Sequence, residues 1–276
     1  MYKQKIGFIG QGFIGKNYAD NFEKRGFDVV RYSKDKFAEN KEKIQECRFV
    51  FLCVPAPTTF KGFDTSILEE VLTLVAPGSI AIIKSTVLPG ITDTLQAKFP
   101  NIFLLHSPEF LTEATAEYDA NHPDRNIVGY TAKSKCVADE VMKILEVAPY
   151  SVIVPAKEAE FIKYGGNCWF YLKVVYINML YDLAQKLGID YEIIKEGMQA
   201  DKRIGNTHLD PIHKGGRGAG GHCFIKDMAA FAMLYEIHLP TDFFGNGLLS
   251  YLQDKNYELL EDSAKDVDLL RNVYVL

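Results

Sequence analysis

The stretch Lys5-Ile6-Gly7-Phe8-Ile9-Gly10-Gln11-Gly12-Phe13-Ile14-Gly15 decides the fold class of this chain. Its first five residues form a short apolar run that is typical of a buried strand, and the remainder fits G-x-G-x-x-G ahead of a helical pattern over residues 13–25. The first glycine permits a tight turn, the second lets the backbone approach a pyrophosphate, and the third lets helix and strand pack closely. Because a helix N-terminus also attracts phosphate, we expect a dinucleotide-binding turn; a purely structural glycine turn is the alternative. The residues expected to contact the dinucleotide here are Gly10, Gly12, Phe13, Ile14 and Gly15.

Short apolar runs alternate with helical stretches through the first half of the chain. The strands expected from these runs cover residues 5–9, 28–32, 49–54, 79–84 and 126–130. Strands separated by helices predict βαβ units and a parallel sheet that is covered on both faces. We therefore expect an α/β fold in which residues 1–156 form a doubly wound, parallel-sheet Rossmann domain.

The second half of the chain has a different pattern. Helical periodicity runs over residues 157–187 until Gly188, a natural stop, and a helix of this length spans about 45 Å. Such a helix suits a connector between domains or the seam of a dimer. Shorter helices interrupted by a loop over residues 208–222 follow, and the polar tail after Leu239 has no clear pattern. We expect residues 157–276 to form a long central helix and a small helical domain.

Composition excludes several classes of protein. The chain has 276 residues, 47% of them hydrophobic, and a net charge of −5, which rules out disorder of the whole chain and suggests about two domains. The mild acidity argues against a nucleic-acid partner, and no apolar run approaches the ~20 residues of a membrane span. The five cysteines are widely spaced without a C-x-x-C pair, so neither a disulfide framework nor a metal site is expected. Residues 1–9 show no signal-peptide pattern. The cysteine usage makes a reducing cytoplasm the expected location.

The residues after the second strand bear on the choice of dinucleotide. An acidic residue usually stands there to hold the adenosine ribose of NAD, and by position the corresponding residue is Ser33. A hydroxyl followed by Lys34, with Arg31 nearby, could instead accept the 2′-phosphate of NADP. The alternative is that Asp35 holds the ribose and that both cations are solvated. We therefore expect NAD, with NADP possible.

Two pairs of polar residues have helical spacing. Lys163 and Asn167 are four residues apart and fall on one face of the long helix, although a solvated lysine is the common case. Glu109 and Glu113 are also four apart, beside apolar neighbours. Paired carboxylates in such surroundings can acquire different pKa values for acid and base work, and they are equally often surface charges.

The most informative segment covers residues 215–227. Glycines surround Ala219, so the backbone there is free to approach a ligand closely. Cys223 follows, next to Lys226 and just before a helical pattern over residues 227–237. A thiol near a helix N-terminus and a cation is a candidate nucleophile. The alternative, a buried core cysteine, fits the other four cysteines better.

Taken together, these segments resemble the UDP-glucose/GDP-mannose dehydrogenase family of nucleotide-sugar dehydrogenases. A single block would be weak, but all of them occur in the family's order between about residues 5 and 227. Besides the first glycine turn, the matching blocks are residues 54–57, 84–90, 107–113, 123–129, 159–167, 203–205 and 220–227.

The resemblance implies a four-electron oxidation of a sugar primary alcohol to a carboxylate with two NAD molecules in turn, UDP-glucose being the expected substrate. Cys223 matches the family nucleophile, which would form a thiohemiacetal and then a thioester. Lys163 matches the lysine that stabilises the developing oxyanion, helped by Asn167. Asp227 would hold Lys163 or a water.

The remaining roles follow from the same resemblance. Glu113 and Thr86 match the groups that position the hydrolytic water, with Glu113 as the acid/base. Further cofactor contacts are expected at Val54, Pro55, Thr86, Glu113 and Lys226. Substrate contacts are expected at Glu109, Phe110, Leu111, Lys163, Asn167, Arg203, Gly220 and Gly221. Arg203 would reach the nucleotide-sugar of the neighbouring subunit in a homodimer built on the long helix.

The chain also departs from the family pattern. Members usually carry a third, C-terminal Rossmann-like domain, and the segment after Asp227 is too short for one. A partner could supply that surface, the substrate could be smaller, or His213, Lys214 and Arg217 could bind phosphate instead. Two alternatives stay open: a two-electron β-hydroxyacid or 6-phosphogluconate-type dehydrogenase, which needs no cysteine, and a truncated, non-catalytic subunit.

Overall fold

The computed structural model of the chain describes residues 4–59 and 62–273. They form two compact units: the first comprises the chain up to Pro57 together with Asp64–Lys163, and the second comprises Thr58–Phe63 and the chain from Tyr164 onward. The expected domain boundary after residue 156 lies about two helical turns before this change of unit. The outer ends of the two expected domains, residues 1–3 and 274–276, lie outside the described residues.

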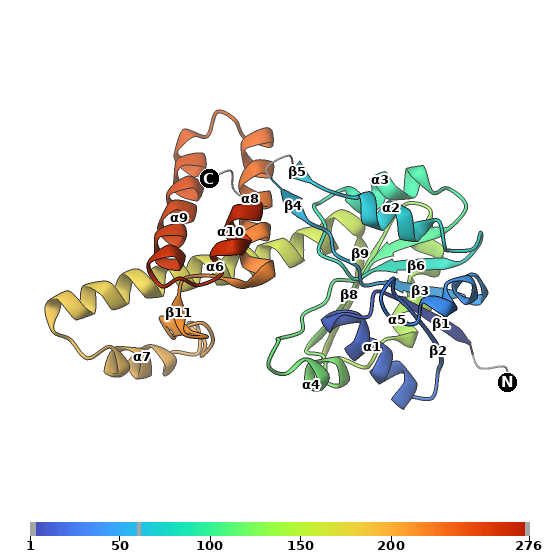
Figure 1. Ribbon diagram of the computed structural model, residues 1–276, viewed down its shortest axis with the longest axis horizontal. Helices are drawn as coiled ribbons and strands as arrows, with labels where there is room; N and C mark the ends of the chain where they lie inside the picture. The colour runs from blue at the N-terminus through green and yellow to red at the C-terminus, as the bar shows by residue number, and fades with distance from the viewer. Residues whose placement is uncertain (1–3, 60–61, 274–276) are drawn as a thin grey trace. The chain divides into compact units, whose positions relative to one another are not determined.

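The first unit is built on one seven-stranded sheet (Figure 1). Its strands are β1 (Lys5–Ile9), β2 (Asp28–Tyr32), β3 (Phe49–Leu52), β6 (Ile80–Ile83), β7 (Phe103–His106), β8 (Arg125–Tyr130) and β9 (Tyr150–Pro155), in the order β2-β1-β3-β6-β7-β8-β9. The first five strands in that order run parallel. The expected doubly wound Rossmann domain is therefore confirmed, and the carboxyl ends of these strands share one edge of the sheet.

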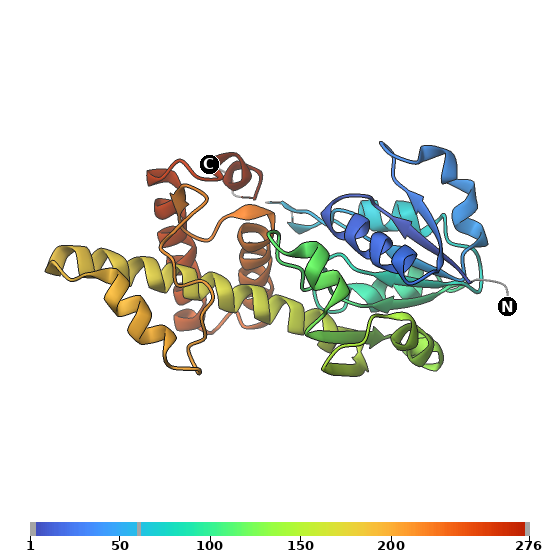
Figure 2. The ribbon, with the colours of Figure 1, turned by 90° about the horizontal axis from the view of Figure 1, so that it is seen from below.

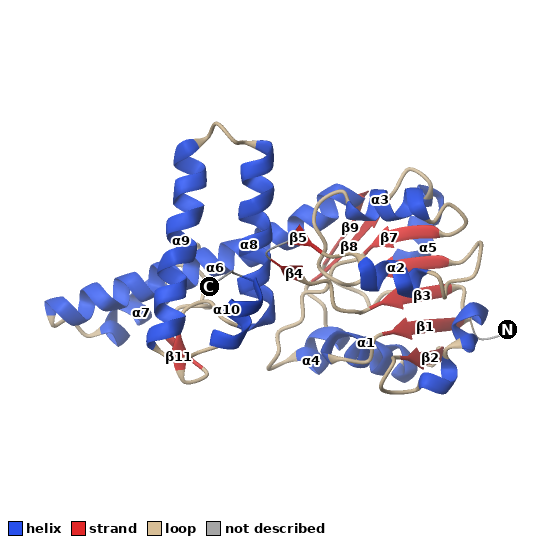
Figure 3. Ribbon diagram, turned by 45° about the horizontal axis from the view of Figure 1, so that its top comes forward, coloured by secondary structure: helices blue, strands red, loops and turns tan. Residues whose placement is uncertain are grey.

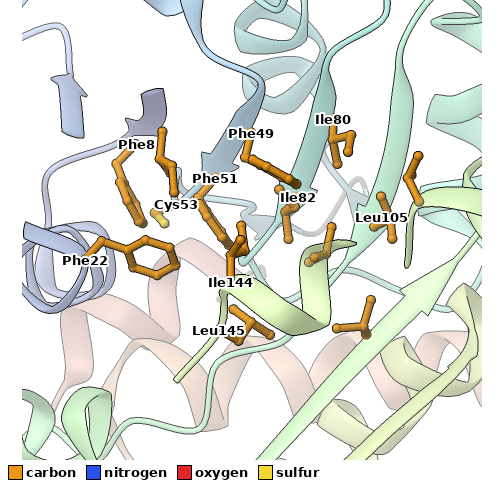
Figure 4. Close-up of a cluster of buried hydrophobic side chains, with 14 of the residues drawn as sticks. Phe8, Phe22, Phe49, Phe51, Cys53, Ile80, Ile82, Leu105, Ile144 and Leu145 are labelled. Atoms are coloured by element: carbon orange, nitrogen blue, oxygen red, sulfur yellow. The ribbon is translucent and has the colours of Figure 1, made fainter. Parts of the chain in front are cut away.

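Helices cover both faces of this sheet (Figure 3). The helical segments between its strands are α1 (Phe13–Lys24), η1 (Ala38–Asn40), η2 (Glu42–Glu46), α2 (Ser66–Leu72), α3 (Ile91–Lys98), α4 (Ala116–Asn121), η3 (Ser134–Val137) and α5 (Ala138–Ile144). Figure 4 shows the core on the side of α1 and α5, where the Phe8 ring stacks on Phe51 at 4.8 Å and meets Phe22 edge-on at 5.3 Å. These buried aromatic side chains fix α1, and with it the glycine turn, against the sheet.

One end of the sheet differs from the expected parallel arrangement. Strand β8 runs antiparallel to β7, and β9 pairs with β8 in parallel. Helix α4 between β7 and β8 has six residues and spans about 9 Å, too little to carry the chain back along a strand. The chain therefore enters β8 from the edge at which β7 ended. Strands β7 and β9 were not among the expected strands, and β7 is a four-residue strand that ends in His106.

The second unit is helical, with two short hairpins (Figures 1 and 2). Its elements are β4 (Thr58–Thr59), β5 (Gly62–Phe63), α7 (Tyr191–Gln199), β10 (Ile212–His213), β11 (Gly216–Arg217), α8 (Gly221–His238), α9 (Phe243–Asp262) and α10 (Val267–Val273). The expected long helix is α6 (Ala156–Leu187), which begins in the first unit and continues through the second. Helix α7 packs on α6 where the Tyr181 and Tyr191 rings meet edge-on at 5.3 Å.

Helix α9 is a 20-residue helix in the tail that the sequence left unassigned. Gly245 and Gly247 lower its helix propensity by about 1 kcal/mol each, and several of its aromatic side chains are exposed, so an apolar periodicity is weak. Packing against α8 compensates for the low propensity. Among residues 4–59 and 62–273, no helix has the length and apolar character needed to cross a membrane.

Candidate active site

The glycine turn between β1 and α1 leaves the start of α1 open. Gly10 has φ +92°, and a Cβ there would lie 2.3 Å from the carbonyl oxygen of Cys53. A Cβ on Gly15 would lie 1.8 Å from the carbonyl oxygen of Gly10, so these two glycines are required by packing. Gly12 differs: it is the N-cap of α1, offers no side-chain cap, and a Cβ there would have no described atom within 4 Å. The first amides of α1, from Phe13 to Gly15, thus fit the pyrophosphate of a dinucleotide.

The cationic side chains at the end of β2 and just after it form ion pairs with neighbouring carboxylates. Arg31 donates to Asp20 at 2.6 Å and to Glu23 at 2.7 Å, while Lys34 donates to Glu70 at 2.9 Å. The hydroxyl of Ser33 donates to Asp35 at 2.8 Å, and this bond lowers the pKa of the Asp35 carboxyl. Both candidate cations for a 2′-phosphate therefore have carboxylate partners, and a carboxylate stands beside Ser33. This arrangement favours NAD over NADP.

The loops after β3 and β6 are joined at the carboxyl edge of the sheet. The Ser85 hydroxyl donates to the carbonyl oxygen of Val54 at 2.5 Å. This bond brings the predicted cofactor residues Val54 and Pro55 alongside the loop that carries Thr86, which is half-buried. The parallel strands thus place these loops at the same edge as the glycine turn.

Lys163 is buried at the first turns of α6 and forms an ion pair with Glu109. Its Nζ atom donates to Oε1 of Glu109 at 2.9 Å, and both side chains are almost fully buried. The other carboxylate oxygen of Glu109 accepts the backbone N–H of Leu111 at 2.8 Å. The Phe110 ring lies under the guanidinium of Arg125, at 3.8 Å, and within 5.4 Å of the Lys163 ammonium. Glu109, assigned to the substrate from the sequence, therefore orients Lys163.

Two further buried groups next to this pair were not singled out from the sequence. Lys84 is buried, donates to the Ser107 hydroxyl at 3.2 Å, and lies 4.3 Å from the centre of the Tyr18 ring. Burial lowers the pKa of Lys84 to about 8. His106 is fully buried, and neither of its ring nitrogens has a hydrogen-bond partner among the described residues. Burial and the charges of Lys84 and Lys163 lower the pKa of His106 to about 3, so the imidazole is neutral. Lys84 directly follows β6, and this position could have indicated it, whereas His106 is the last residue of β7, a strand that was not expected.

A surface hollow of about 1400 Å³ in the first unit brings Phe13 and Glu113 together. It follows α1 and α4, and Asn17 and Tyr118 also line it. Glu113 is exposed there, at the start of the turn that leads to α4. One predicted dinucleotide contact and the predicted acid/base residue therefore border the same hollow.

The second unit contains the other predicted catalytic residues. Asp227 is fully buried on α8, and its carboxylate accepts hydrogen bonds from Asn167 at 2.6 Å and from Lys226 at 2.5 Å. The sequence assigned Asp227 to Lys163 or to a water, whereas its partners are Asn167 and Lys226. Lys226, a predicted cofactor contact, is thus held by its neighbour.

Cys223 lies in the first turn of α8 and is exposed. Three of the other thiols are buried or half-buried, and burial raises the pKa values of Cys47, Cys53 and Cys168 to about 12. Cys136 is also exposed, on the short helix η3 of the first unit. Cys223 is therefore the accessible thiol of the predicted catalytic segment.

Side chains from other parts of the second unit contact the glycine loop that precedes α8. Gly220 is the N-cap of α8, and a Cβ there would lie 2.1 Å from Oδ2 of Asp266. Gly221 has φ +78° with open space around its Cβ position. Arg217 donates to Asn178 at 2.8 Å and pairs with Asp182 at 2.7 Å, so this guanidinium ties the loop to α6 and has carboxylate and amide partners in place of a phosphate.

Arg203 lies in the turn that follows α7. Its exposed guanidinium pairs with Asp201, two residues earlier, at 2.6 Å. Within the described residues, no group of three or more His, Cys, Asp or Glu side chains has an arrangement that could hold a metal ion.

The fold and the glycine turn define the class: a dinucleotide-binding Rossmann domain followed by a long helix and a helical domain. The model of the NAD binding domain of the UDP-glucose/GDP-mannose dehydrogenase family matches residues 33–146, and the model of its central domain matches residues 157–246. The chain belongs to this family, and its cofactor is NAD. The glycine turn precedes the matched residues and is assigned from its geometry.

Curated relatives agree with this assignment. The chain is 30% identical over 225 residues to a UDP-glucose 6-dehydrogenase of Rickettsia bellii, covering 77% of this chain and 51% of the relative. It is 30% identical over 213 residues to a UDP-glucose 6-dehydrogenase of Bacillus subtilis, covering 72% and 47%. The chain thus spans about half the length of the curated relatives it matches.

Solved structures share the fold. A UDP-glucose dehydrogenase from Pyrobaculum islandicum superposes with a TM-score of 0.77 at 24% identity, covering 95% of this chain and 71% of that one. A 3-hydroxyisobutyrate dehydrogenase from Mycobacterium tuberculosis superposes with a TM-score of 0.73 at 16% identity, covering 95% and 96%. The fold is therefore common to sugar-nucleotide and hydroxyacid dehydrogenases, and the catalytic residues must distinguish them.

Proposed function

We propose that this protein is a nucleotide-sugar 6-dehydrogenase that oxidises a sugar primary alcohol to a carboxylate, with UDP-glucose as the first candidate substrate. The observation that carries the proposal is the exposed thiol of Cys223 in the first turn of α8, one turn before the buried Asp227 and its partners Asn167 and Lys226. A hydroxyacid dehydrogenase has no use for a nucleophilic thiol at this place.

NAD, when bound, accepts a hydride from the sugar carbon in each of two oxidations. Overall, one primary alcohol, one water and two NAD⁺ give one carboxylate, two NADH and three protons. The open start of α1 would bind the pyrophosphate. The carboxylate of Asp35, placed beside Ser33 after β2, would hold the adenosine ribose.

Cys223 would act as the covalent nucleophile. Its sulfur adds to the aldehyde carbon formed in the first oxidation and gives a thiohemiacetal, which the second oxidation converts into a thioester. The position of Cys223 in the first turn of α8 leaves its sulfur accessible to a substrate. Asp227 would act by orienting Asn167 and Lys226, its two observed partners.

Lys163 would stabilise negative charge on the sugar oxygen, with Asn167 one turn further along α6. The ion pair with Glu109 fixes the ammonium group in a buried position, where an electrostatic interaction is stronger than in water. Glu113 and Thr86 would position the water that hydrolyses the thioester, and Glu113 is exposed enough to exchange its proton with solvent.

Recognition of the sugar nucleotide would involve Phe110, Leu111, Gly220 and Gly221. Arg203 would serve a neighbouring subunit, since its guanidinium is exposed and is held by Asp201, two residues earlier. The reduced, widely spaced cysteines suit a reducing compartment, and we place the reaction in the cytoplasm.

A second copy of the chain would pack on α6. Trp169, Tyr176 and Leu183 follow one another at seven-residue intervals on this helix, and each is more than half exposed. Residues at this spacing share one face of a helix, as in helix pairs with heptad packing. Sedimentation of the wild type as a dimer, and of Tyr176→Glu as a monomer, would support this seam; a wild-type monomer would contradict it.

The proposed function is tested with a panel of substrates. The purified protein is incubated with NAD and UDP-glucose, other sugar nucleotides, hexose phosphates and 3-hydroxy acids, and NADH is followed at 340 nm. NADH formation with a sugar nucleotide, and its loss in Lys163→Ala, supports the proposal. Turnover of a hydroxy acid that survives Cys223→Ala would identify a two-electron dehydrogenase, and no turnover with any substrate would favour a non-catalytic subunit.

A further inference from the structure

The glycine loop that leads to Cys223 is held from one side by residues 256–266, a segment beyond the family match that ends at residue 246. We call this segment the C-terminal clamp. In the second unit, α8, α9 and α10 pack together, and β11 of the loop contacts α9 (Figure 1). The clamp consists of the last part of α9 and the turn that joins it to α10.

Asn256 holds the centre of the loop. Its Oδ1 atom accepts the N–H of Ala219 at 2.6 Å, and its Nδ2 atom donates to the carbonyl oxygen of Ala219 at 3.0 Å. The Asn256 side chain is 1% exposed, so these two bonds are shielded from water. An amide side chain that satisfies both backbone groups of one residue fixes that residue in place.

Asp266 caps the helix that carries Cys223. Gly220, the N-cap of α8, cannot supply a side-chain acceptor, and Oδ2 of Asp266 accepts the N–H of Gly221 at 2.8 Å instead. The carboxylate reaches this position only because residue 220 has no Cβ. An acceptor and a negative charge at this place stabilise the helix start, and Cys223 is the third residue of that helix.

Two more contacts complete the clamp. Lys265 donates to the carbonyl oxygen of Gly218 at 2.9 Å, and the Ser263 hydroxyl accepts the N–H of Arg217 at 2.9 Å. Backbone groups of residues 217, 218, 219 and 221 are thus all bound by the clamp. On its other side the loop is tied to α6 through Arg217.

The turn of the clamp is strained, which shows that these contacts determine its conformation. Ala264 and Asp266 have φ values of 53° and 55°, in the left-handed region that costs a non-glycine residue about 1 kcal/mol or more. Between them, the N–H of Lys265 donates to the carbonyl oxygen of Leu260. Strain of this kind persists only where surrounding contacts enforce it.

We infer that the C-terminal clamp positions Cys223 for catalysis, with Asp266 as its principal positioning residue, acting through the start of α8. This inference rests on the proposed function of Cys223 as the nucleophile. Asp266 touches neither thiol nor substrate in this role; it fixes the first turn from which the thiol projects. A displacement of about 1 Å at a reacting group can lower a rate by up to about 100-fold.

The test compares three variants in the full chain: Asp266→Ala, Asp266→Asn and, as control, Asp268→Ala. Asp268 is an exposed carboxylate two residues further on, in the first turn of α10. Asparagine retains an oxygen that accepts the Gly221 N–H, whereas alanine does not. Because both substitutions remove the same charge, the difference between them isolates the cap.

We expect Asp266→Ala to lower kcat with the sugar nucleotide about 10- to 100-fold, with KM for NAD within about twofold of wild type. We expect Asp266→Asn to restore kcat to within about threefold, and Asp268→Ala to match wild type. Equal kcat values for Asp266→Ala and Asp266→Asn would overturn the inference while leaving the proposed function intact.

A second readout needs no turnover. Iodoacetamide labelling of the peptide with Cys223 is timed against the peptide with Cys136, the exposed thiol of the first unit. Labelling of Cys223 should be at least about threefold slower in Asp266→Ala than in Asp266→Asn, because a frayed helix start stabilises the thiolate less; labelling of Cys136 should not change. Equal labelling of Cys223 would contradict the clamp even if no dehydrogenase activity is found.

A milder pair of variants covers the case in which Asp266→Ala does not fold, as judged by circular dichroism. Lys265→Met keeps the aliphatic stem and loses the bond to the Gly218 carbonyl, whereas Lys265→Arg keeps a donor. The methionine variant should have a kcat about 3- to 10-fold below that of the arginine variant. Identical values would contradict the inference.

Discussion

Helices α1 and α8 both follow a glycine-rich turn and both have a glycine at the N-cap, yet their N-termini differ. At α1, in the first unit, Gly12 faces open space, and no described side chain caps the helix. At α8, in the second unit, the carboxylate of Asp266 occupies the corresponding place. The same sequence signal therefore precedes an open helix start in one unit and a closed one in the other.

A third helix supports this distinction. Helix α3 begins after Gly90, and Glu160 of α6 accepts the N–H groups of Gly90, at 2.5 Å, and Thr92, at 2.8 Å, together with the Thr92 hydroxyl. A carboxylate from a distant part of the chain thus closes both α3 and α8. A helix start can bind a phosphate when no carboxyl group of the protein already accepts hydrogen bonds from its first N–H groups. The spacing of the glycines alone does not show whether such a carboxyl group is present.

The largest effect is expected at the glycine turn of α1. Gly15→Ala places a Cβ 1.8 Å from a backbone oxygen, and we expect it to lower the free energy of unfolding by about 3 kcal/mol. Gly12→Ala meets open space and should change stability by less than about 0.5 kcal/mol while weakening NAD binding at least 10-fold. Urea unfolding and calorimetric titration with NAD measure the two effects. Wild-type NAD affinity in Gly12→Ala would show that the start of α1 is not the phosphate site.

The pH dependence of stability should reflect the closed start of α3. Burial raises the pKa of Glu160 to about 7, above the usual 4.5. The folded state then binds more protons than the unfolded state between these values, so this carboxyl stabilises most below pH 4.5 and its contribution falls as the pH rises towards 7. The loss is about 3 kcal/mol, and Glu160→Gln should lack it. The free energies of unfolding of the wild type and Glu160→Gln are measured by urea unfolding at pH 5 and pH 7.5. An equal change between the two pH values in both proteins would contradict this prediction.

A smaller effect is expected at the closed start of α8. Gly220→Ala pushes a Cβ towards the flexible carboxylate of Asp266, which can move, so we expect a loss of about 1–2 kcal/mol. In the Asp266→Ala background the same substitution should cost less than about 0.5 kcal/mol. The coupling in this double-mutant cycle measures the contact directly. Additive losses would show that the two residues do not interact.

The smallest effect is expected after β2. Lys34 pairs with Glu70, so Lys34→Ala should change the ratio of kcat/KM with NAD to that with NADP by less than about twofold. The exposed pair contributes little to stability either. Initial rates with both dinucleotides provide the measurement. A large fall in activity with NADP alone would place Lys34 at a 2′-phosphate.

The parts of the fold with a strong sequence pattern were predictable, and there are physical reasons why the other elements were not. Strand β1 is an apolar run directly before the glycine turn and α6 has a sustained helical period, and the observed bounds agree closely with the expected ones. Strand β7 is too short for a period, the direction of β8 depends on the length of α4, and α9 carries two glycines. Tertiary packing decides such elements.

The sequence was enough to predict which residues belong to the candidate site. It was not enough to predict which of their side chains form hydrogen bonds and ion pairs with one another. Blocks of sequence identified Lys163, Asn167, Cys223 and Asp227, but the partner of each side chain depends on the fold. Glu109 pairs with Lys163, and Asp227 pairs with Asn167. Asn256 and Asp266 of the clamp lie 37 and 45 residues beyond the loop residues that they bind, and nothing in the local sequence indicates these contacts.

The thioester mechanism is tested most directly by counting the NADH formed per sugar nucleotide consumed, in the wild type and in Cys223→Ser. We predict two NADH per sugar and a carboxylate product in the wild type, both lost in the variant, because oxidation beyond the aldehyde needs the thioester. One NADH per molecule consumed, unchanged in Cys223→Ser, would contradict this mechanism.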